Sequence, residues 1–261
     1  MLALNTNAAN LDNFYLPGFK NDPSNHIAWL EAELAEIEAN GGIAYIIGHY
    51  YQEDFSKEFG LRYHALMERY QHIVRNSLNG HTHDQFYQVT MSMTHPDKSI
   101  GTVQIGPSVT TYTDENPGYA ILDVDAKTML PINYRIFAMD LAEANSSGTP
   151  VWKEVVNYTE DYGLGTGVSP ASLLDLSLRF AQDQDLYWQY EWDMTRQKGK
   201  KHVGTVAQWE HGSERLYCRY TSVTKYAESV CNNGKEKAKN SIKDELIGKW
   251  KKLANEDSFL Q

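Results

Sequence analysis

The chain has 261 residues, of which 41% are hydrophobic and 22% are charged, and this composition is typical of one large folded domain or of a domain with a small appendage. Its formal net charge is -10 at pH 7 with a sequence pI near 5.4, which disfavours nucleic acid as a partner because an acidic surface repels phosphate backbones. The longest apolar run, Ile43–Ile47, is far shorter than a transmembrane segment, and the first residues lack the pattern of a signal peptide.

The first part of the chain alternates between strand and helix patterns. Asp22 and Pro23 are typical of a helix start, and the apolar stripe that follows them stops at Asn40-Gly41-Gly42. The order strand–helix–strand–helix–strand predicts a parallel α/β layer, in which ligands lie outside the carboxyl ends of the strands. We expect a short strand at 2–5, a helix at 22–39, a buried strand at 42–49, a helix at 58–75 and a short strand at 77–81.

Histidines follow two of these expected strands. His49 comes directly after Gly48, and "NGHTHDQF" places His81 after Gly80 with His83 two residues further on. In an extended segment residues i and i+2 point to the same side, so His81 and His83 would face one metal centre or two adjacent ones. Neutral imidazole is a common zinc ligand. Because an H-x-H also arises by chance, the matched positions at strand ends are what favours a metal site over plain surface histidines.

After Phe86 the pattern changes to apolar or alternating segments separated by turn residues. Four antiparallel strands are expected at 85–93, 99–106, 118–125 and 129–141. From about Val151 the chain is expected to become helical, with helices starting at Ser169-Pro170, near Leu186–Arg196 and near Ser213–Val230. The two cysteines, at 218 and 231, leave open whether they are free thiols or one local bridge.

Many separate blocks of the sequence resemble one enzyme family. "GHTHDQF" looks like the Gly-His-x-His motif of calcineurin-like metallophosphoesterases, and "IIGH" resembles their preceding Gly-His block. The order of "ALNTN", "HIAWLEAEL", "IIGH", "RYQHIV", "GHTHDQF" and "GPSVTTYTDENPGY" is similar to acid sphingomyelinase and the acid sphingomyelinase-like phosphodiesterases. The later blocks "YTEDYGL", "SPASLLDL" and "QDLYWQYEW", with the cysteines thirteen residues apart, resemble that family's helical C-terminal region. The similarity covers about Leu2 to Cys231.

This resemblance implies a fold class and a division of the chain. The fold would be α/β, a partial metallophosphoesterase-type α/β/β/α sandwich with a C-terminal helical subdomain. Residues 1–145 would form the C-terminal part of a metallophosphoesterase domain and residues 146–232 the helical subdomain. Residues 233–261, rich in lysine and glutamate, would form a charged helical or mobile tail.

The resemblance also implies a chemistry. In that family two zinc ions bridge a water or hydroxide that attacks phosphorus, and by resemblance His49 and His81 would bind one metal and His83 the other. The loop at 107–119 would lie near the pocket, with Tyr112 as a candidate substrate contact or, equally, a packing residue. The substrate would be a phosphodiester such as the sphingolipid sphingomyelin.

The chain departs from the family pattern in its ligand motifs. The family's Asp-x-His, Gly-Asp and Gly-Asn-His motifs, which supply the remaining metal ligands, do not occur in the 261 residues. We therefore expect either a phosphodiester hydrolase that is incomplete in this chain or a catalytically inactive remnant that serves as a binding or assembly subunit. A partner chain or a second copy is expected to cover an exposed edge of the sheet.

The family resemblance further implies an extracellular or lysosomal protein. The sequons at Asn145 and Asn157 fit such an origin as glycosylation sites. In an oxidising compartment Cys218 and Cys231 would form a disulfide. No transmembrane segment is expected.

Overall fold

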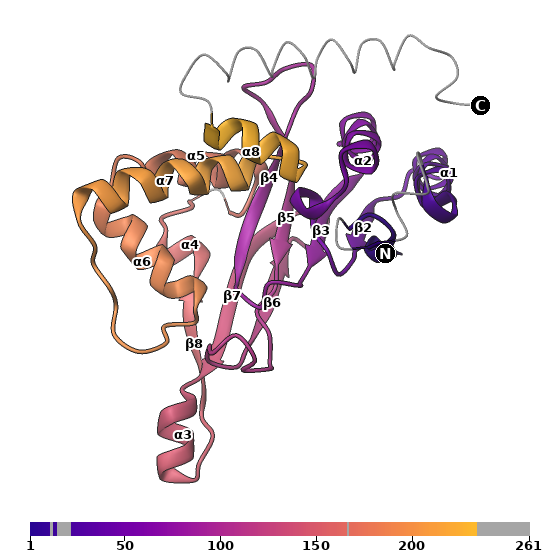
Figure 1. The fold of residues 1–261 in the computed structure, drawn as a ribbon. Helices are drawn as coiled ribbons and strands as arrows, with labels where there is room; N and C mark the ends of the chain where they lie inside the picture. The colour runs from indigo at the N-terminus through magenta and orange to yellow at the C-terminus, as the bar shows by residue number, and fades with distance from the viewer. Residues whose placement is uncertain (11–12, 15–21, 166, 234–261) are drawn as a thin grey trace.

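Two β-sheets form the centre of the fold, and helices cover them (Figure 1). The computed structural model describes residues 1–10, 13–14, 22–165 and 167–233, so the expected tail lies outside the described residues except for its first position. The five-stranded sheet has the order β1-β2-β3-β5-β4 and the three-stranded sheet the order β6-β7-β8. Their bounds are β1 Leu2–Ala3, β2 Ala44–Ile47, β3 Val74–Asn79, β4 Phe86–Met91, β5 Ser99–Ile105, β6 Gly118–Val124, β7 Pro131–Met139 and β8 Trp152–Asn157.

The five-stranded sheet is mostly parallel. Strands β1, β2, β3 and β5 run in one direction, and only β4 is antiparallel to its neighbour β5. One row across the parallel strands pairs Leu2 with Ile46, Ile46 with Ser77, and Ser77 with Val103. The expected α/β fold is confirmed. Because β2, β3 and β5 run parallel, their carboxyl ends lie at the same edge of the sheet.

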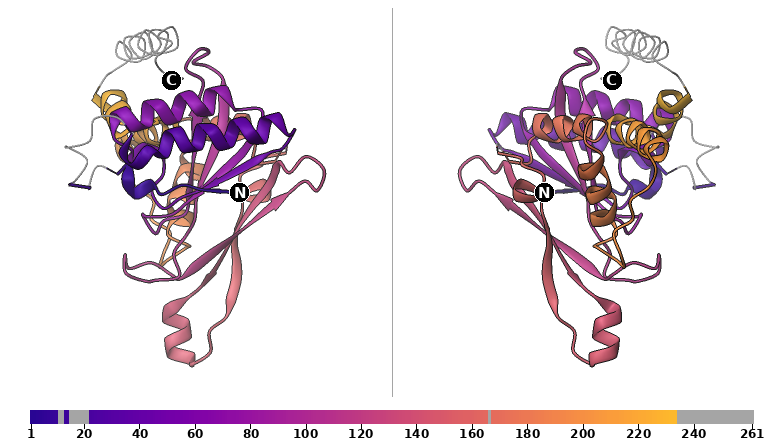
Figure 2. Two further views of the ribbon diagram at one scale, coloured as in Figure 1. Left: turned by 90° about the vertical axis from the view of Figure 1, so that its right-hand side faces the viewer. Right: turned by 90° about the vertical axis from the view of Figure 1, so that its left-hand side faces the viewer.

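Two helices, α1 (His26–Ala39) and α2 (Lys57–Arg69), lie side by side on one face of this sheet (Figure 2). The carboxylate of Asp22 accepts hydrogen bonds from the backbone N–H groups of Ile27 (2.9 Å) and Ala28 (3.0 Å), which satisfies donors that a helix start leaves free. Leu30 and Leu34 of α1 are completely buried in the cluster beneath the two helices. The apolar stripe predicted from the sequence is therefore the packing face of α1.

A second core lies under the C-terminal helices and is mainly aromatic. These helices are α4 (Tyr158–Asp161), α5 (Pro170–Arg179), α6 (Gln184–Met194), α7 (Val206–Thr221) and α8 (Lys225–Asn233). Buried tyrosines keep hydrogen-bond partners there: Tyr87 lies 2.9 Å from the Ser177 hydroxyl, and Tyr162 donates to Asp193 at 2.9 Å. The buried tyrosines of this core thus serve packing.

Four local expectations are wrong. The segment at 99–105 (β5) is antiparallel to β4 as expected, but on its other side it pairs in parallel with β3, because alternation shows that a segment is a strand but not its direction. The helix α2 ends at Arg69 and Val74 already belongs to β3. Residues 152–157, expected to be helical, form β8 and pair with β7. The single helix expected near Ser213–Val230 is two helices, α7 and α8.

The connection between β7 and β8 carries a short helix, α3 (Leu141–Ser147), which projects from the rest of the molecule (Figure 1). The side chain of Asp140 caps its first turn by accepting from the Glu143 N–H at 2.9 Å. Gly148 ends it with a φ of +69°, a conformation that glycine adopts without strain.

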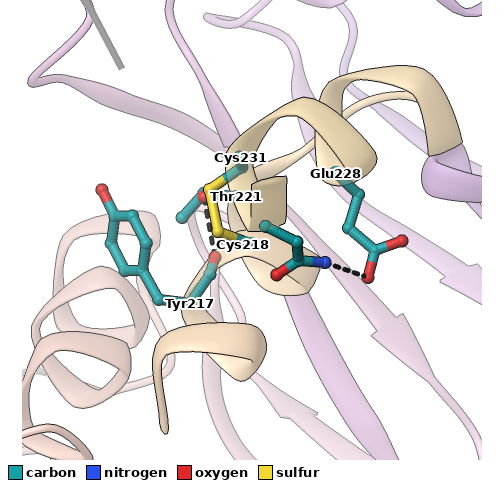
Figure 3. The surroundings of a disulfide bond; sticks show 6 residues. Tyr217, Cys218, Thr221, Glu228 and Cys231 are labelled. Atoms are coloured by element: carbon teal, nitrogen blue, oxygen red, sulfur yellow. Dashed lines mark hydrogen bonds between the residues drawn. A yellow bond between two sulfur atoms is a disulfide. The ribbon is translucent and has the colours of Figure 1, made fainter. Parts of the chain in front are cut away.

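Cys218 of α7 and Cys231 of α8 form a disulfide, as the family resemblance implied (Figure 3). The bridge holds α8 against α7, and the Thr221 hydroxyl donates to the Tyr217 carbonyl within the last turn of α7. None of the helices in the described part of the chain combines the length and the apolar character needed to cross a membrane.

Candidate metal and phosphodiester site

His49 lies where the sequence predicted it, just beyond the carboxyl end of β2. The Thr6 hydroxyl accepts hydrogen bonds from the backbone N–H groups of His49 (3.0 Å) and Tyr50 (2.8 Å), which fixes the chain as it leaves the strand. A Cβ at Gly48 would lie 2.7 Å from a methyl of Thr6, closer than carbon atoms approach. Glycine at 48 is therefore required by close packing rather than by an unusual backbone angle.

His81 lies beyond the carboxyl end of the neighbouring strand β3, so two strand ends bring two histidines together. The ring centres of His49 and His81 are 5.2 Å apart with their planes at 77°. The ring of Tyr50 lies 4.2 Å from that of His81. The expected meeting of the two strand ends is thus found in the structure.

His83 does not follow the expectation of an extended segment. His81 and His83 both have positive φ angles, of 86° and 70°, so the chain turns between them and the rule that residues i and i+2 share a side does not apply. The His83 ring instead faces Tyr112, with 6.2 Å between ring centres. Left-handed backbone at residues other than glycine is uncommon and is concentrated at functional sites.

The three histidines fit a zinc centre in part. Two imidazoles on one tetrahedral zinc have ring centres about 5 Å apart, and the His49–His81 pair has this spacing. The Nδ1 atom of His83 is buried and has no hydrogen-bond partner among the described residues, as expected of an atom that awaits a ligand. However, the described part of the chain contains no group of three histidine, cysteine, aspartate or glutamate side chains that could hold a metal ion. A complete centre needs further ligands.

Tyr112 lies in the loop that leaves β5, the third strand whose carboxyl end meets this edge. The tyrosine is 86% exposed, so it is not a packing residue. The loop is tied to the histidines, because the Ser108 N–H donates to the His83 carbonyl at 3.3 Å. An exposed aromatic ring beside a histidine is suited to contact a ligand.

Comparison with known proteins shows which proteins this chain resembles in sequence. No family model matches the chain. The chain is 30% identical over 192 residues to "Sphingomyelin phosphodiesterase" of Bos taurus, which covers 72% of this chain and 31% of that protein. It is 27% identical over 192 residues to the Homo sapiens protein of that name, covering 72% and 30%. To "Acid sphingomyelinase-like phosphodiesterase 3b" of Homo sapiens it is 25% identical over 210 residues, covering 73% and 45%.

Over the matched residues, this chain belongs to the sphingomyelin phosphodiesterase family. It spans about a third of the length of the sphingomyelin phosphodiesterases that it matches. The family resemblance read from the histidine motifs is confirmed.

A buried carboxylate follows His49 in this family member and was missed in the sequence. Glu53, in a short 3₁₀ turn (Gln52–Asp54), is fully buried and pairs with Lys225 of α8 and with Arg219 of α7, whose Nε is 3.5 Å away. The pKa of Glu53 is raised to about 7, because burial raises it more than the two cations lower it. Burial also raises the pKa of Asp54, which Lys225 and then the nearby His81 lower. The disulfide-linked helices therefore hold the turn next to the histidine pair.

A second carboxylate pair lies beside His83. The pKa of Glu115 is raised to about 7, mainly by burial and also by the hydrogen-bonded Asp84 carboxyl, although Arg196 lowers it. Asp84 is recognisable in the sequence as a possible acceptor that orients an imidazole, but sequence reasoning passed over Glu115 and Arg196, because these partners are far apart in the chain. The sequence offers one signal for the two carboxylates: Asp84 directly follows His83, and Glu115 lies in the same loop as Tyr112.

The two sequons lie in different surroundings. Asn145 is exposed on α3. The side chain of Asn157 is engaged: its amide donates to Glu154 at 3.1 Å, and its oxygen accepts from Asn133 at 2.8 Å. Only Asn145 presents a free amide for modification.

Proposed function

We propose that this chain takes part in hydrolysis of a phosphodiester of the sphingomyelin type. The observation that carries the proposal is the pairing of His49 and His81 at adjacent strand ends, 5.2 Å between ring centres, in a chain of the sphingomyelin phosphodiesterase family. The relatives are named for sphingomyelin, a lipid phosphodiester, and this choice of substrate class rests on their names.

Zinc is the cofactor in this proposal. His49 and His81 would hold one ion and His83 another, with further ligands needed to complete each centre. Zinc would supply a Lewis acid that lowers the pKa of a bound water and neutralises charge on phosphoryl oxygens. The chain's own residues orient the ligands: Thr6 fixes the backbone at His49, and Tyr50 packs against the His81 ring. Tyr112, exposed beside His83, would contact the substrate.

A second candidate function is a catalytically inactive binding or assembly subunit. It is favoured by the lack of any group of three potential ligands among the described residues. In that case a partner chain or a second copy would cover the edge of the five-stranded sheet at β1, which pairs only with β2 in the described part of the chain. Sedimentation of the purified chain distinguishes a self-associated form from a monomer.

We propose that the protein works in an extracellular or lysosomal compartment. The Cys218–Cys231 bridge supports this placement because disulfides persist in oxidising compartments. The exposed amide of Asn145 is compatible with glycosylation there.

Hydrolysis of an aryl phosphodiester in the presence of zinc tests the catalytic proposal. We expect turnover that is lost in His81→Ala and retained in the matched control His211→Ala, which removes an exposed histidine of α7. If the wild-type chain binds zinc through His81 but has no turnover, the inactive subunit is the better account. Turnover that survives His81→Ala contradicts the proposed site.

A further inference from the structure

Arg196, just beyond α6, is the largest of the fully buried side chains, with none of its side-chain surface exposed. Its φ of +55° is left-handed, and the next residue, Gln197, has a φ of +57°. A buried guanidinium is tolerated only where its donors are paired, because desolvation of an isolated charge is costly. The partners of Arg196 therefore show what it is for.

The guanidinium of Arg196 bridges two loops of the candidate site. Its Nη1 donates to the carbonyl oxygen of His83 at 2.6 Å. Its Nε donates to the carbonyl oxygen of Asn116, and its Nη2 forms an ion pair with the Glu115 carboxylate at 2.6 Å. One planar group thus joins the histidine loop to the loop that carries Tyr112, a geometry that arginine allows and lysine does not.

These contacts act where the backbone is unusual. His83 is held in the left-handed region with a φ of +70°, and such a conformation persists only where its surroundings fix it. The His83 carbonyl accepts from both Arg196 and the Ser108 N–H. The position of the His83 ring, 6.2 Å from Tyr112, depends on this carbonyl being anchored.

The space for Arg196 is also specific. A Cβ at Gly118, the first residue of β6, would collide with Cδ of Arg196 and would lie 3.2 Å from the Phe137 carbonyl oxygen. The absence of a side chain at 118 therefore lets the arginine pass beneath the loop to reach His83.

We propose that Arg196 is a positioning residue for the phosphodiesterase site, which sets the relative placement of His83 and the Tyr112 loop. The inference rests on the proposed function. Because Arg196 is shielded from solvent, it does not touch a substrate and acts only through His83, Glu115 and Asn116. It links a zinc-ligand candidate to a substrate-contact candidate that lies 29 residues later in the sequence.

The test uses Arg196→Lys, which keeps the charge but lacks the separate guanidinium nitrogens that bond the His83 and Asn116 carbonyls and pair with Glu115. Long-range ¹H–¹⁵N spectra of the imidazoles and hydrogen exchange at the Ser108 amide are measured in the full chain. We expect the His83 signals to shift and Ser108 to exchange at least about tenfold faster, with His49 and His81 unchanged. The matched control is Arg179→Lys, whose guanidinium donates to the Tyr162 carbonyl away from the histidines.

Glu115→Gln is the second variant, and it decides the question if Arg196→Lys does not fold. It removes the ion-pair partner and leaves the shape of the side chain, so we expect the same His83 and Ser108 responses in weaker form. Unchanged His83 signals and Ser108 exchange in a folded variant overturn the inference, as does an equal shift of all three histidines. With an aryl phosphodiester and zinc, a lowered kcat/KM is the expected kinetic response, because a zinc-ligand candidate and a substrate-contact candidate are both displaced. A wild-type chain without turnover refutes the proposed function but leaves the spectroscopic result readable.

Discussion

Opening the Cys218–Cys231 disulfide is predicted to lower the free energy of unfolding by an amount set by the number of residues between the two cysteines. The bridge spans a sequence separation of 13 residues between α7 and α8. In the chain-entropy account, closing a loop of this size removes enough freedom from the unfolded chain to stabilise the fold by about 3 kcal/mol at 25 °C. For a chain of this size that corresponds to a fall in Tm of roughly 6–12 °C.

Thermal unfolding followed by circular dichroism measures this effect in Cys231→Ala and in the double variant with Cys218→Ala. Because either change opens the same loop, we expect the single and double variants to unfold within a degree or two of each other. The 3₁₀ turn at Glu53 should also exchange its amide hydrogens faster, because the bridge holds Lys225 over it. Wild-type Tm values in both variants would refute the reasoning, and so would losses that simply add.

Three further predictions concern other parts of the chain. Because the folded-state pKa of Glu53 is about 7 against an ordinary 4.5, the folded protein holds a proton that the unfolded chain has lost in that window. The free energy of unfolding should therefore fall by up to about 1.4 kcal/mol per pH unit from pH 4.5 to 7. Urea unfolding measured at several pH values should show that this free energy falls less steeply with pH in Glu53→Gln. Phe180→Ala removes a ring with no exposed surface, 4.6 Å from that of Tyr190, and should cost about 3–5 kcal/mol in urea unfolding; a loss below about 1 kcal/mol would contradict the packing. In a secretory host, peptide mass spectrometry should find a glycan on Asn145 and none on Asn157, and the reverse pattern would contradict the hydrogen bonding described for Asn157.

The parallel sheet and the histidine pair could be predicted from the sequence because both depend on local pattern. A strand–helix–strand order forces neighbouring strands to run parallel, and this brings the residues after β2 and β3 to one edge. The closeness of His49 and His81 follows directly from that rule, because each comes just after one of these strands. The loop after β5 reaches the same edge, but the direction of β5 depends on pairing with β3, which no local pattern reveals.

The placement of His83 could not be predicted from its spacing. The i, i+2 rule holds in strands, and β3 ends at Asn79, before either histidine of the motif. What fixes His83 is a contact with Arg196, 113 residues later in the chain. The sequence shows an arginine near the end of a helix, which is usually solvated, and only the tertiary fold shows that it is buried.

The buried carboxylates were missed for the same reason. Glu53 is recognisable as special only once Arg219 and Lys225, from helices more than 160 residues away, are seen to enclose it. Residue type alone assigns such groups to the surface, since unpaired charges are rarely buried. The partner determines the burial, and the partner is not local.

The central claim is that His49 and His81 form part of one metal site. Isothermal titration of the metal-free chain with zinc tests it most directly, in the wild type, in His49→Ala, in His81→Ala and in the control His211→Ala. We predict that each of the first two variants binds zinc more weakly by a factor of about ten or more, and that the two losses do not simply add when both changes are combined, because both rings serve one ion. Equal zinc affinity in the wild type and in His81→Ala would contradict the account.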